Sequence, residues 1–343
     1  MNKWYEQTGN NIDVVIGTRV SLARNIAQYP FTSRLDTQGK VEICEKIKDT
    51  VRELDVSKRS RLYNDRFKYI KMSDLTHDEA ISLAERSLVS PEFVSCADGR
   101  ALLMQEDESV SIMLCEEDHI KIQAMISGLE LDKAYSLTDE IDTALDREFQ
   151  FAFDKNLGYL TQCPTNIGTA LKASVLLHLP ALGTSRQISR LVSTVSKLGL
   201  TLTGVYGDAS SPKSNIYLLS NQVTLGISEK SAIENLGSIT LQIIEQERTA
   251  RQELLKDLRY QDILWRSCGT LQNARILGFE EFLQDISNIR IASSDETFNV
   301  SMEKINELII TMQPATINAS KGERLDRQQR DAIRAEKVRE IFQ

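Results

Sequence analysis

Short apolar segments alternate with amphipathic segments along the first two thirds of the chain. Those with the length and apolar content of strands are Val14–Ile16, Ala101–Met104, Val110–Leu114, Leu157–Thr161, Ala173–Leu179, Thr201–Tyr206 and Ile216–Leu219. The first of them is expected to run into a polar turn over Thr18–Leu22. The acidic stretch Glu106–Glu108 is expected to join the second and third segments as a turn.

Other segments repeat their apolar residues at helical spacing, and several have end signals. They are Lys40–Leu54, Asp78–Leu88, Asp132–Phe149, Ser185–Leu198, and a long helix that Ser228 caps and that runs through Glu245 towards Leu258. Ser185–Leu198 has the clearest pattern, because its apolar residues recur at i, i+3, i+4, i+7 and i+10 before Gly199. From about residue 256 the pattern is helical to the end, with an interruption near Pro314–Gly322.

The order of these elements predicts a mixed α+β fold followed by a smaller helical part. We place a catalytic-sized domain at residues 1–255 and a helical domain at residues 256–343, with a continuous helix able to cross the boundary. A chain of 343 residues is long enough for either one large or two medium domains. No internal repeat is visible.

Charge and composition argue against several classes of protein, namely nucleic-acid-binding, membrane-spanning and secreted proteins. Lys and Arg number 41 against 49 Asp and Glu, so the net charge is −8, which argues against non-specific nucleic-acid binding. No apolar run reaches the length of a membrane span, and the polar start of the chain lacks the pattern of a signal peptide. We therefore expect a cytoplasmic protein.

Several site chemistries have no support in the sequence. The five cysteines include no CxxC pair and the three histidines are scattered, so reduced thiols are expected rather than disulfides or a zinc site. The sequence contains no GxGxxG, no GxxxxGK[ST] and no GxSxG. Several common enzyme classes are thereby excluded.

Two segments carry residues that are suited to a cationic substrate. Cys115–His119 contains three adjacent carboxylates after an apolar strand, and paired carboxylates can hold a guanidinium or accept its proton. Tyr159–Thr169 places the thiol of Cys163 before a proline and several hydroxyl groups, where an ionised thiol could contact the same cation. A solvated acidic turn and a buried packing cysteine are the plainer alternatives.

Taken together and in order, these segments resemble the phosphagen (guanidino) kinase family, and most closely its bacterial branch, the protein arginine kinases. The matching stretches are Val15–Asn25, Glu116–Ile120, Tyr159–Thr169, Ala173–Pro180, Val205–Gly207 and Ser220–Gly226. The resemblance implies an antiparallel sheet flanked by helices, with a C-terminal helical domain that dimerises. It also implies transfer of the γ-phosphate of ATP, with Mg held by the nucleotide phosphates, to arginine side chains of proteins.

That activity would mark proteins for a Clp-type protease, so the implied partners are protein substrates, a Clp unfoldase and an activator protein, in addition to a second copy in a homodimer. By the same resemblance, Glu117 would orient and deprotonate the guanidinium, and Cys163 would contact it. Asp208 falls where the family usually has Glu, on a loop that closes over the substrate, and is one methylene shorter.

The phosphate-binding arginines of the family are only partly present. Arg19 matches the first, whereas Ser21, Lys121, Lys172 and Thr203 occupy the positions of the other four. Lysine keeps the charge without the planar fork that holds phosphate oxygens bidentately, and Ser or Thr loses the charge. The neighbouring residues assigned to the same nucleotide site are Thr18, Ala173 and Ser174. Arg24 is a possible replacement cation, and Cys115 stands where the family usually has Asn.

The C-terminal segment Arg330–Ala335 matches the RDxxRA motif that forms a phosphoarginine pocket in protein arginine kinases. On a helix, Arg330 and Arg334 share a face and could grip a phosphate, while Asp331 pairs with the guanidinium. A solvated charged helix is the alternative.

Two functions therefore remain open. The first is an active protein arginine kinase in which lysines partly replace arginines. The second is a pseudokinase that binds phosphoarginine as a scaffold or regulator. A kinase for free small guanidino compounds is less well supported, because those relatives carry an N-terminal helical domain and the Thr-Arg-Val stretch begins here at residue 18.

Overall fold

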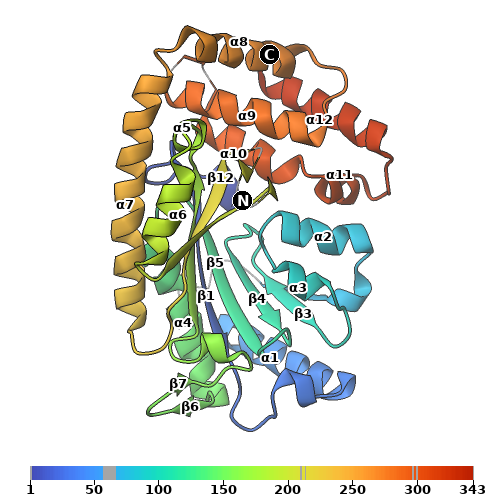
Figure 1. The fold of residues 1–343 in the computed structure, drawn as a ribbon. Helices are drawn as coiled ribbons and strands as arrows, with labels where there is room; N and C mark the ends of the chain where they lie inside the picture. The colour runs from blue at the N-terminus through green and yellow to red at the C-terminus, as the bar shows by residue number, and fades with distance from the viewer. Residues whose placement is uncertain are drawn as a thin grey trace.

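A computed structural model describes residues 2–56, 67–208, 211–212, 214–295, 297–298 and 300–342 (Figure 1). Its centre is an eight-stranded sheet in the order β2-β3-β4-β5-β1-β8-β12-β9, and every neighbouring pair is antiparallel. These strands are β1 (Val15–Arg24), β2 (Lys68–Lys71), β3 (Ala101–Met104), β4 (Val110–Leu114), β5 (Ile120–Ser127), β8 (Leu171–His178), β9 (Leu200–Gly204) and β12 (Ile216–Asn221). The predicted α+β class with an antiparallel sheet is confirmed.

The longest strand, β1, corrects one prediction from the sequence. Thr18–Leu22 was expected to be a turn, but these residues pair with β5 on one side and β8 on the other. Their polar and apolar side chains alternate, so Arg19 and Ser21 lie on one face of the sheet while Val20 and Leu22 lie in the core on the other. The polar residues of this segment therefore belong to an amphipathic strand and not to a turn.

Helices cover one whole face of the sheet. They are α1 (Thr37–Val56), α4 (Leu131–Phe149), α5 (Pro180–Thr184), α6 (Ile188–Ser196) and α7 (Glu229–Leu254). Their apolar residues pack with Val20, Leu22 and Val175 in one core cluster and with Ile112 and Ile122 in another. In Figure 1, α4, α6 and the long α7 line this side.

The predicted helix Ser185–Leu198 is confirmed as α6, except that it begins three residues later, at Ile188, because a break separates α6 from the short α5. The break lies at Arg186, whose φ of 58° is left-handed, and the amide of Gln187 donates back to the carbonyl of Leu182. The predicted strand Leu157–Thr161 shrinks to β7 (Gly158–Tyr159), which lies outside the large sheet, pairs with β6 (Phe153–Asp154) and forms a single bridge to Gly168. The apolar period of the helix does begin at Ile188, whereas the apolar content of Leu157–Thr161 could not show how short its strand is.

In the described part of the chain, the opposite face of the sheet is covered at its two ends. The helices α2 (His77–Glu85) and α3 (Pro91–Val94) pack Leu83 and Phe93 onto β3 and β4. The C-terminal helices pack onto Leu176 and Ile216. These helices are α8 (Leu258–Asn273), α9 (Phe279–Ser294), α10 (Met302–Thr311), α11 (Pro314–Lys321) and α12 (Arg327–Phe342). Between the two coverings, the face carries polar side chains.

The interruption predicted near Pro314–Gly322 is also wrong, because that segment forms α11, which Gly322 ends with a φ of 69°. This helix docks against α2. Glu85 accepts hydrogen bonds from the amides of Ala315 and Thr316 at 3.0 and 2.7 Å, which satisfies the free N–H groups of the helix start. Within the described residues, no helix combines the length and the apolar content that crossing a membrane requires.

Candidate active site

The register of four strands gathers most of the predicted phosphate-binding positions on the partly open face. Arg19 and Ser21 of β1 lie opposite Ser174 and Lys172 of β8, and Ala23 of β1 lies opposite Lys121 of β5. Residues opposite each other in an antiparallel pair share a face. Thr203 of β9 lies opposite Leu218 of β12, and Leu218 lies opposite Leu176 of β8. Because Leu176 is two residues from Ser174 on β8, Thr203 is on the same face of the sheet.

Three cations on this face lie close enough to influence each other. Burial lowers the pKa of Lys172, and the positive charges of Arg19 and Lys121 lower it further. Burial also lowers the pKa of Arg19, whose Nε donates to Ser174 Oγ at 3.2 Å. Within the described chain no ion pair joins Arg19 or Lys172 to a carboxylate, whereas Lys121 Nζ lies 3.2 Å from Glu116. Among the described residues, Arg19 and Lys172 therefore supply positive charge that no carboxylate neutralises.

The two positions without a charge have different surroundings. Ser21 is buried, and its hydroxyl donates to the carbonyl of Lys172 at 3.3 Å. Thr203 is exposed on the edge strand β9, so its side chain has room around it. Neither residue adds a cation to the face, which leaves two of the five expected clamp positions without charge.

Thr18 and Ala173 are not brought together with the other predicted nucleotide residues. They alternate with Arg19 and Ser174 along their strands and therefore lie on the helix-covered face. The hydroxyl of Thr18 donates to Gly128 O at 2.7 Å and accepts from Glu130 N at 3.1 Å, and Ala173 packs in the core. Both side chains therefore have a structural role and do not face the candidate site.

Arg24 does not provide the replacement cation that the sequence allowed. It is 1% exposed on the helix-covered face, and its Nε lies 2.8 Å from Asp142 and its NH2 group 3.3 Å from Glu229. Its guanidinium also lies over the Tyr159 ring, 3.5 Å from the centroid, and donates to Thr169 O at 3.0 Å. Tyr159 and Thr169 are the two ends of the segment that contains Cys163, called here the Cys163 loop. Arg24 therefore links both ends of this loop to α4 and α7.

The three carboxylates of the acidic turn have different environments. Glu116 accepts a hydrogen bond from Ser90 and pairs with Lys121. Asp118 is buried and accepts from Asn25 Nδ2 at 2.6 Å and from the amide of Gln162 at 2.8 Å. Only Glu117 has an exposed side chain. It is the carboxylate of this turn that remains available to a substrate.

Glu117 and Cys163 come together although 46 positions separate them in the sequence. Partial burial and the charges of Asp118 and Glu116 raise the pKa of Glu117, while Lys121 and a hydrogen bond from the Cys163 thiol oppose that rise. Cys163 is half-buried, and its sulfur lies 3.0 Å from the Thr165 hydroxyl. A carboxylate and a thiol that meet in this way are suited to binding a planar cation.

A buried network fixes the turn and the Cys163 loop relative to β1. Asn25 bridges Asp118 and the amide of His119. His119 accepts from the amide of Ile26 through Nδ1, so its Nε2 carries the proton and donates to Pro30 O at 2.9 Å. Asn25 and Gln162 were not predicted as supporting residues. Their only signal was their position within the matched stretches Val15–Asn25 and Tyr159–Thr169.

Two predicted positions remain to be placed. Asp208 belongs to the strand β10 (Gly207–Asp208), which pairs with β11 (Ser211–Pro212), but its side chain lies outside the described part of the chain. The RDxxRA segment lies on α12, where Arg334 is 1% exposed and donates to Met312 O, Leu277 O and Asp331 at 2.9, 2.7 and 2.5 Å.

Arg330 donates to the carbonyl of Leu325 at 2.6 Å. The guanidinium of Arg334 also lies 5.4 Å from the centroid of the Phe279 ring. The two arginines share one helix, as expected, but Arg334 holds α12 against the neighbouring helices in this conformation. A phosphate ligand would therefore have to compete with these contacts.

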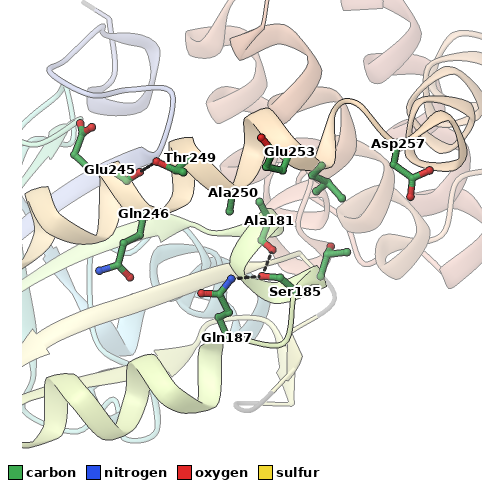
Figure 2. Close-up of a pocket in the computed structure, with 11 residues that line it drawn as sticks. Ala181, Ser185, Gln187, Glu245, Gln246, Thr249, Ala250, Glu253 and Asp257 are labelled. Atoms are coloured by element: carbon green, nitrogen blue, oxygen red, sulfur yellow. Dashed lines mark hydrogen bonds between the residues drawn. The ribbon is translucent and has the colours of Figure 1, made fainter.

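A cavity of about 710 Å³ lies apart from this face, between α5 and α7 (Figure 2). It is lined by Ala181, Thr184, Ser185, Gln187, Glu245, Gln246, Thr249, Ala250, Glu253, Leu254 and Asp257. None of these residues belongs to the predicted site. Glu245 and Glu253 pair with Arg248 and Lys256, and Asp257 caps α8, so the cavity adds no reactive group.

The sequence matches two family models along its length. The model described as ATP:guanido phosphotransferase, C-terminal catalytic domain, covers residues 45–250, and the model described as protein-arginine kinase McsB C-terminal domain covers residues 257–343. A protein-arginine kinase of Halothermothrix orenii is 38% identical over 342 residues, which are 99% of this chain and 96% of that protein. One of Brevibacillus brevis is 39% identical, with 99% and 94% covered.

Solved structures share the fold at lower identity. The duplicated taurocyamine kinase of Schistosoma mansoni has a TM-score of 0.61 and 22% identity, over 78% of this chain and 40% of that one. A lombricine kinase has a TM-score of 0.58 and 20% identity, over 71% and 70% of the two chains. At these identities the likeness concerns the fold alone.

Proposed function

Because the chain belongs to the ATP:guanido phosphotransferase family and, within it, to the protein-arginine kinases, we propose that it transfers the γ-phosphate of ATP to arginine side chains of proteins. The observation that carries the proposal is the meeting of Glu117 with Cys163 beside a face that carries Arg19 and Lys172. One part of the site suits a guanidinium and the other suits phosphates.

On the guanidinium side, Glu117 orients the substrate and accepts its proton, and the thiol of Cys163 contacts the same group. A carboxylate whose pKa is raised is a stronger base than an ordinary one, and the burial and neighbouring charges at Glu117 act in that direction. Asp118, Asn25 and Gln162 position both groups without touching the substrate.

On the phosphate side, Arg19, Lys172 and Lys121 bind the polyphosphate, with Ser174 orienting Arg19. Phosphoryl transfer is catalysed mainly by positioning and by positive charge, so a face with two cations that have no carboxylate partner among the described residues fits this ligand. Within the described residues no group of three or more His, Cys, Asp or Glu side chains could hold a metal ion. In the proposed reaction the Mg ion is carried by the nucleotide phosphates.

We extend the proposal to the partners and the organisation of the chain. Residues 1–255 form the catalytic domain and residues 256–343 a helical domain for dimerisation and regulation, in which Arg330, Asp331 and Arg334 bind phosphoarginine once the contacts of Arg334 open. Asp208 closes over the substrate. The phosphorylated proteins are delivered to a Clp unfoldase, and an activator protein assists the reaction.

A second candidate function is a pseudokinase that binds phosphoarginine proteins without turnover. The observation in its favour is the absence of charge at Ser21 and Thr203, together with the commitment of Arg24 to Asp142 and Glu229. Loss of one preorganised donor costs roughly 10²–10³ in rate, so two such losses could leave little activity.

Phosphotransfer itself separates the two candidates. The purified chain is incubated with Mg-ATP and an unfolded, arginine-containing protein, and phosphoarginine is sought by mass spectrometry under non-acidic handling. We expect a signal that Glu117→Gln abolishes while Glu92→Gln, an exposed glutamate on α3, retains it. No phosphoarginine, even with an activator protein added, would refute the kinase and favour the binding role.

A further inference from the structure

Two buried cysteines from distant parts of the chain meet directly behind the acidic turn. Cys44 lies on α1, Cys115 follows β4, and 71 positions separate them in the sequence. Their sulfur atoms are 3.8 Å apart, and the two residues are 2% and 0% exposed. Cys96 is exposed, Cys163 is half-buried, and Cys268 is buried elsewhere in the C-terminal core. Among the described residues, no other thiol pair is in contact.

We propose that Cys44 and Cys115 are a modification site, at which a small oxidant of the peroxide class converts the two thiols into an intramolecular disulfide. A disulfide needs sulfurs about 2.05 Å apart, so the two atoms must approach by about 1.8 Å from their present 3.8 Å. No large rearrangement is needed, because both side chains already lie in one cluster with Ile43 and Leu114.

The hydrogen bonds of the two thiols leave their sulfurs facing each other. Cys44 shares its thiol between Gly99 O at 3.4 Å and Cys115 Sγ, and Cys115 donates to Lys40 O at 3.6 Å. The sulfur of Cys115 is therefore the acceptor of the pair.

The reaction balances with peroxide as the only co-reactant. The first thiol loses its proton and attacks one peroxide oxygen, which breaks the O–O bond, gives a sulfenic acid and releases one water. The second thiol then displaces the sulfenic hydroxyl as a second water and forms the S–S bond. Two thiols lose two electrons and two hydrogens, and one peroxide molecule becomes two waters.

The reaction is slow at neutral pH and accelerates with rising pH. The hydrogen bond with Cys115 and, after it, burial raise the pKa of Cys44, and the thiolate rather than the thiol is the nucleophile. Only a water-sized oxidant reaches two sulfurs that are this buried. The pair thus responds to sustained peroxide and not to bulky disulfides, whereas the exposed Cys96 reacts with both.

The position of Cys115 connects the disulfide to the candidate active site. Its amide donates to His119 O at 2.9 Å and closes the turn that carries Glu116 and Glu117. Its φ of 58° is left-handed, so the turn has little freedom to absorb a shift of this residue. Drawing its sulfur towards α1 displaces Glu117 from Cys163. This consequence rests on the proposed function, whereas the disulfide itself does not.

The test maps the disulfide by mass spectrometry. The reduced full chain is treated with hydrogen peroxide at pH 7, 8 and 9, alkylated under denaturing conditions, and digested without a reductant. We expect a linked Cys44–Cys115 peptide that disappears on reduction, and whose initial rate of formation rises about tenfold per pH unit while the thiolate fraction is small. The same yield is expected in Cys96→Ser, which removes an exposed thiol.

Two variants remove the pair by different routes. Cys115→Asn suits the left-handed backbone, and Cys44→Ala is a small apolar replacement, so failure of one to fold leaves the other. The proposal is overturned if Cys44 and Cys115 stay unlinked while Cys96 and Cys163 oxidise. It is also overturned if Cys115 links to Cys163, or if the peptide forms only where circular dichroism shows unfolding.

Phosphotransfer is the second readout. If the reduced chain phosphorylates protein arginines, peroxide treatment should lower that rate at least tenfold, a reductant should restore it, and Cys115→Asn should resist the loss. A reduced chain without activity would refute the proposed function and leave the disulfide mapping to decide this inference by itself.

Discussion

Arg24 offers the sharpest test of how the active-site loop is held. Its side chain is 1% exposed and neutralises Asp142, at 2.8 Å, together with Glu229 at 3.3 Å. In Arg24→Met the packing volume is largely kept, but Asp142 remains buried without its cation. Breaking a buried pair by removing one partner typically costs about 3–5 kcal/mol in the free energy of unfolding.

The loss in the free energy of unfolding caused by Arg24→Met should be larger at high pH than at low pH. Burial raises the pKa of Asp142 to about 6, although Arg24 opposes that rise. Without Arg24 the pKa rises further, so Asp142 is neutral at pH 5 and needs no partner. At pH 8 it must stay charged and unpaired, or bind a proton at about 1.4 kcal/mol for each pH unit above its pKa.

The assay is urea unfolding of the wild type and of Arg24→Met at pH 5 and pH 8, followed by circular dichroism. We expect a loss of about 3–5 kcal/mol at pH 8 and roughly half of that at pH 5. Adding Asp142→Leu to Arg24→Met should recover most of the loss at pH 8, because no buried charge remains. Equal losses at the two pH values, or no recovery in the double variant, would refute the reasoning.

Four further outcomes are expected. Thr203→Arg should raise the phosphotransfer kcat roughly tenfold or more, because its exposed side chain can restore a phosphate fork, whereas Thr203→Gln should not. Lys172→Ala should weaken ATP binding in calorimetry while Lys172→Arg keeps it. The kcat/KM of the chain should fall with decreasing pH at a midpoint above 4.5, since the pKa of Glu117 is raised and its charged form is the base. Glu85→Ala should lower the urea-unfolding free energy by about 1–3 kcal/mol, because two amides of α11 lose their acceptor, whereas the exposed Glu92→Ala should change it little.

Most of the sheet could be predicted from local patterns. The segments Ala101–Met104 and Val110–Leu114 coincide with β3 and β4, because a short apolar run between turn residues has few other solutions. The start of α7 follows from the Ser228 cap. The break at Arg186 could not be predicted from residue type, since arginine rarely adopts the left-handed backbone that it has here, although the apolar period begins only after it, at Ile188.

The candidate site was only partly predictable. The matched stretches predicted that Glu117 and Cys163 contact the substrate, and the structure places the two side chains in contact with each other. Thr18 and Ala173 were named from the same matched stretches, yet each lies on the other face of its strand from Arg19 or Ser174. A motif shows which residues are neighbours along the chain. Because successive side chains of a strand point to opposite faces of the sheet, about half of the residues in such a motif face away from the site.

By itself the sequence determined the family, the alternation of elements and the residue types available for chemistry, because these depend on local patterns and on the order of motifs. Only the tertiary structure decided which cations remain unpaired, since Arg24 turns to Asp142 while Lys172 and Arg19 stay without a carboxylate in the described chain. It alone brought Cys44 against Cys115 and committed Arg334 to its neighbouring carbonyl groups. Partners of this kind are separated by tens of positions or more, so strand register and helix docking decide them.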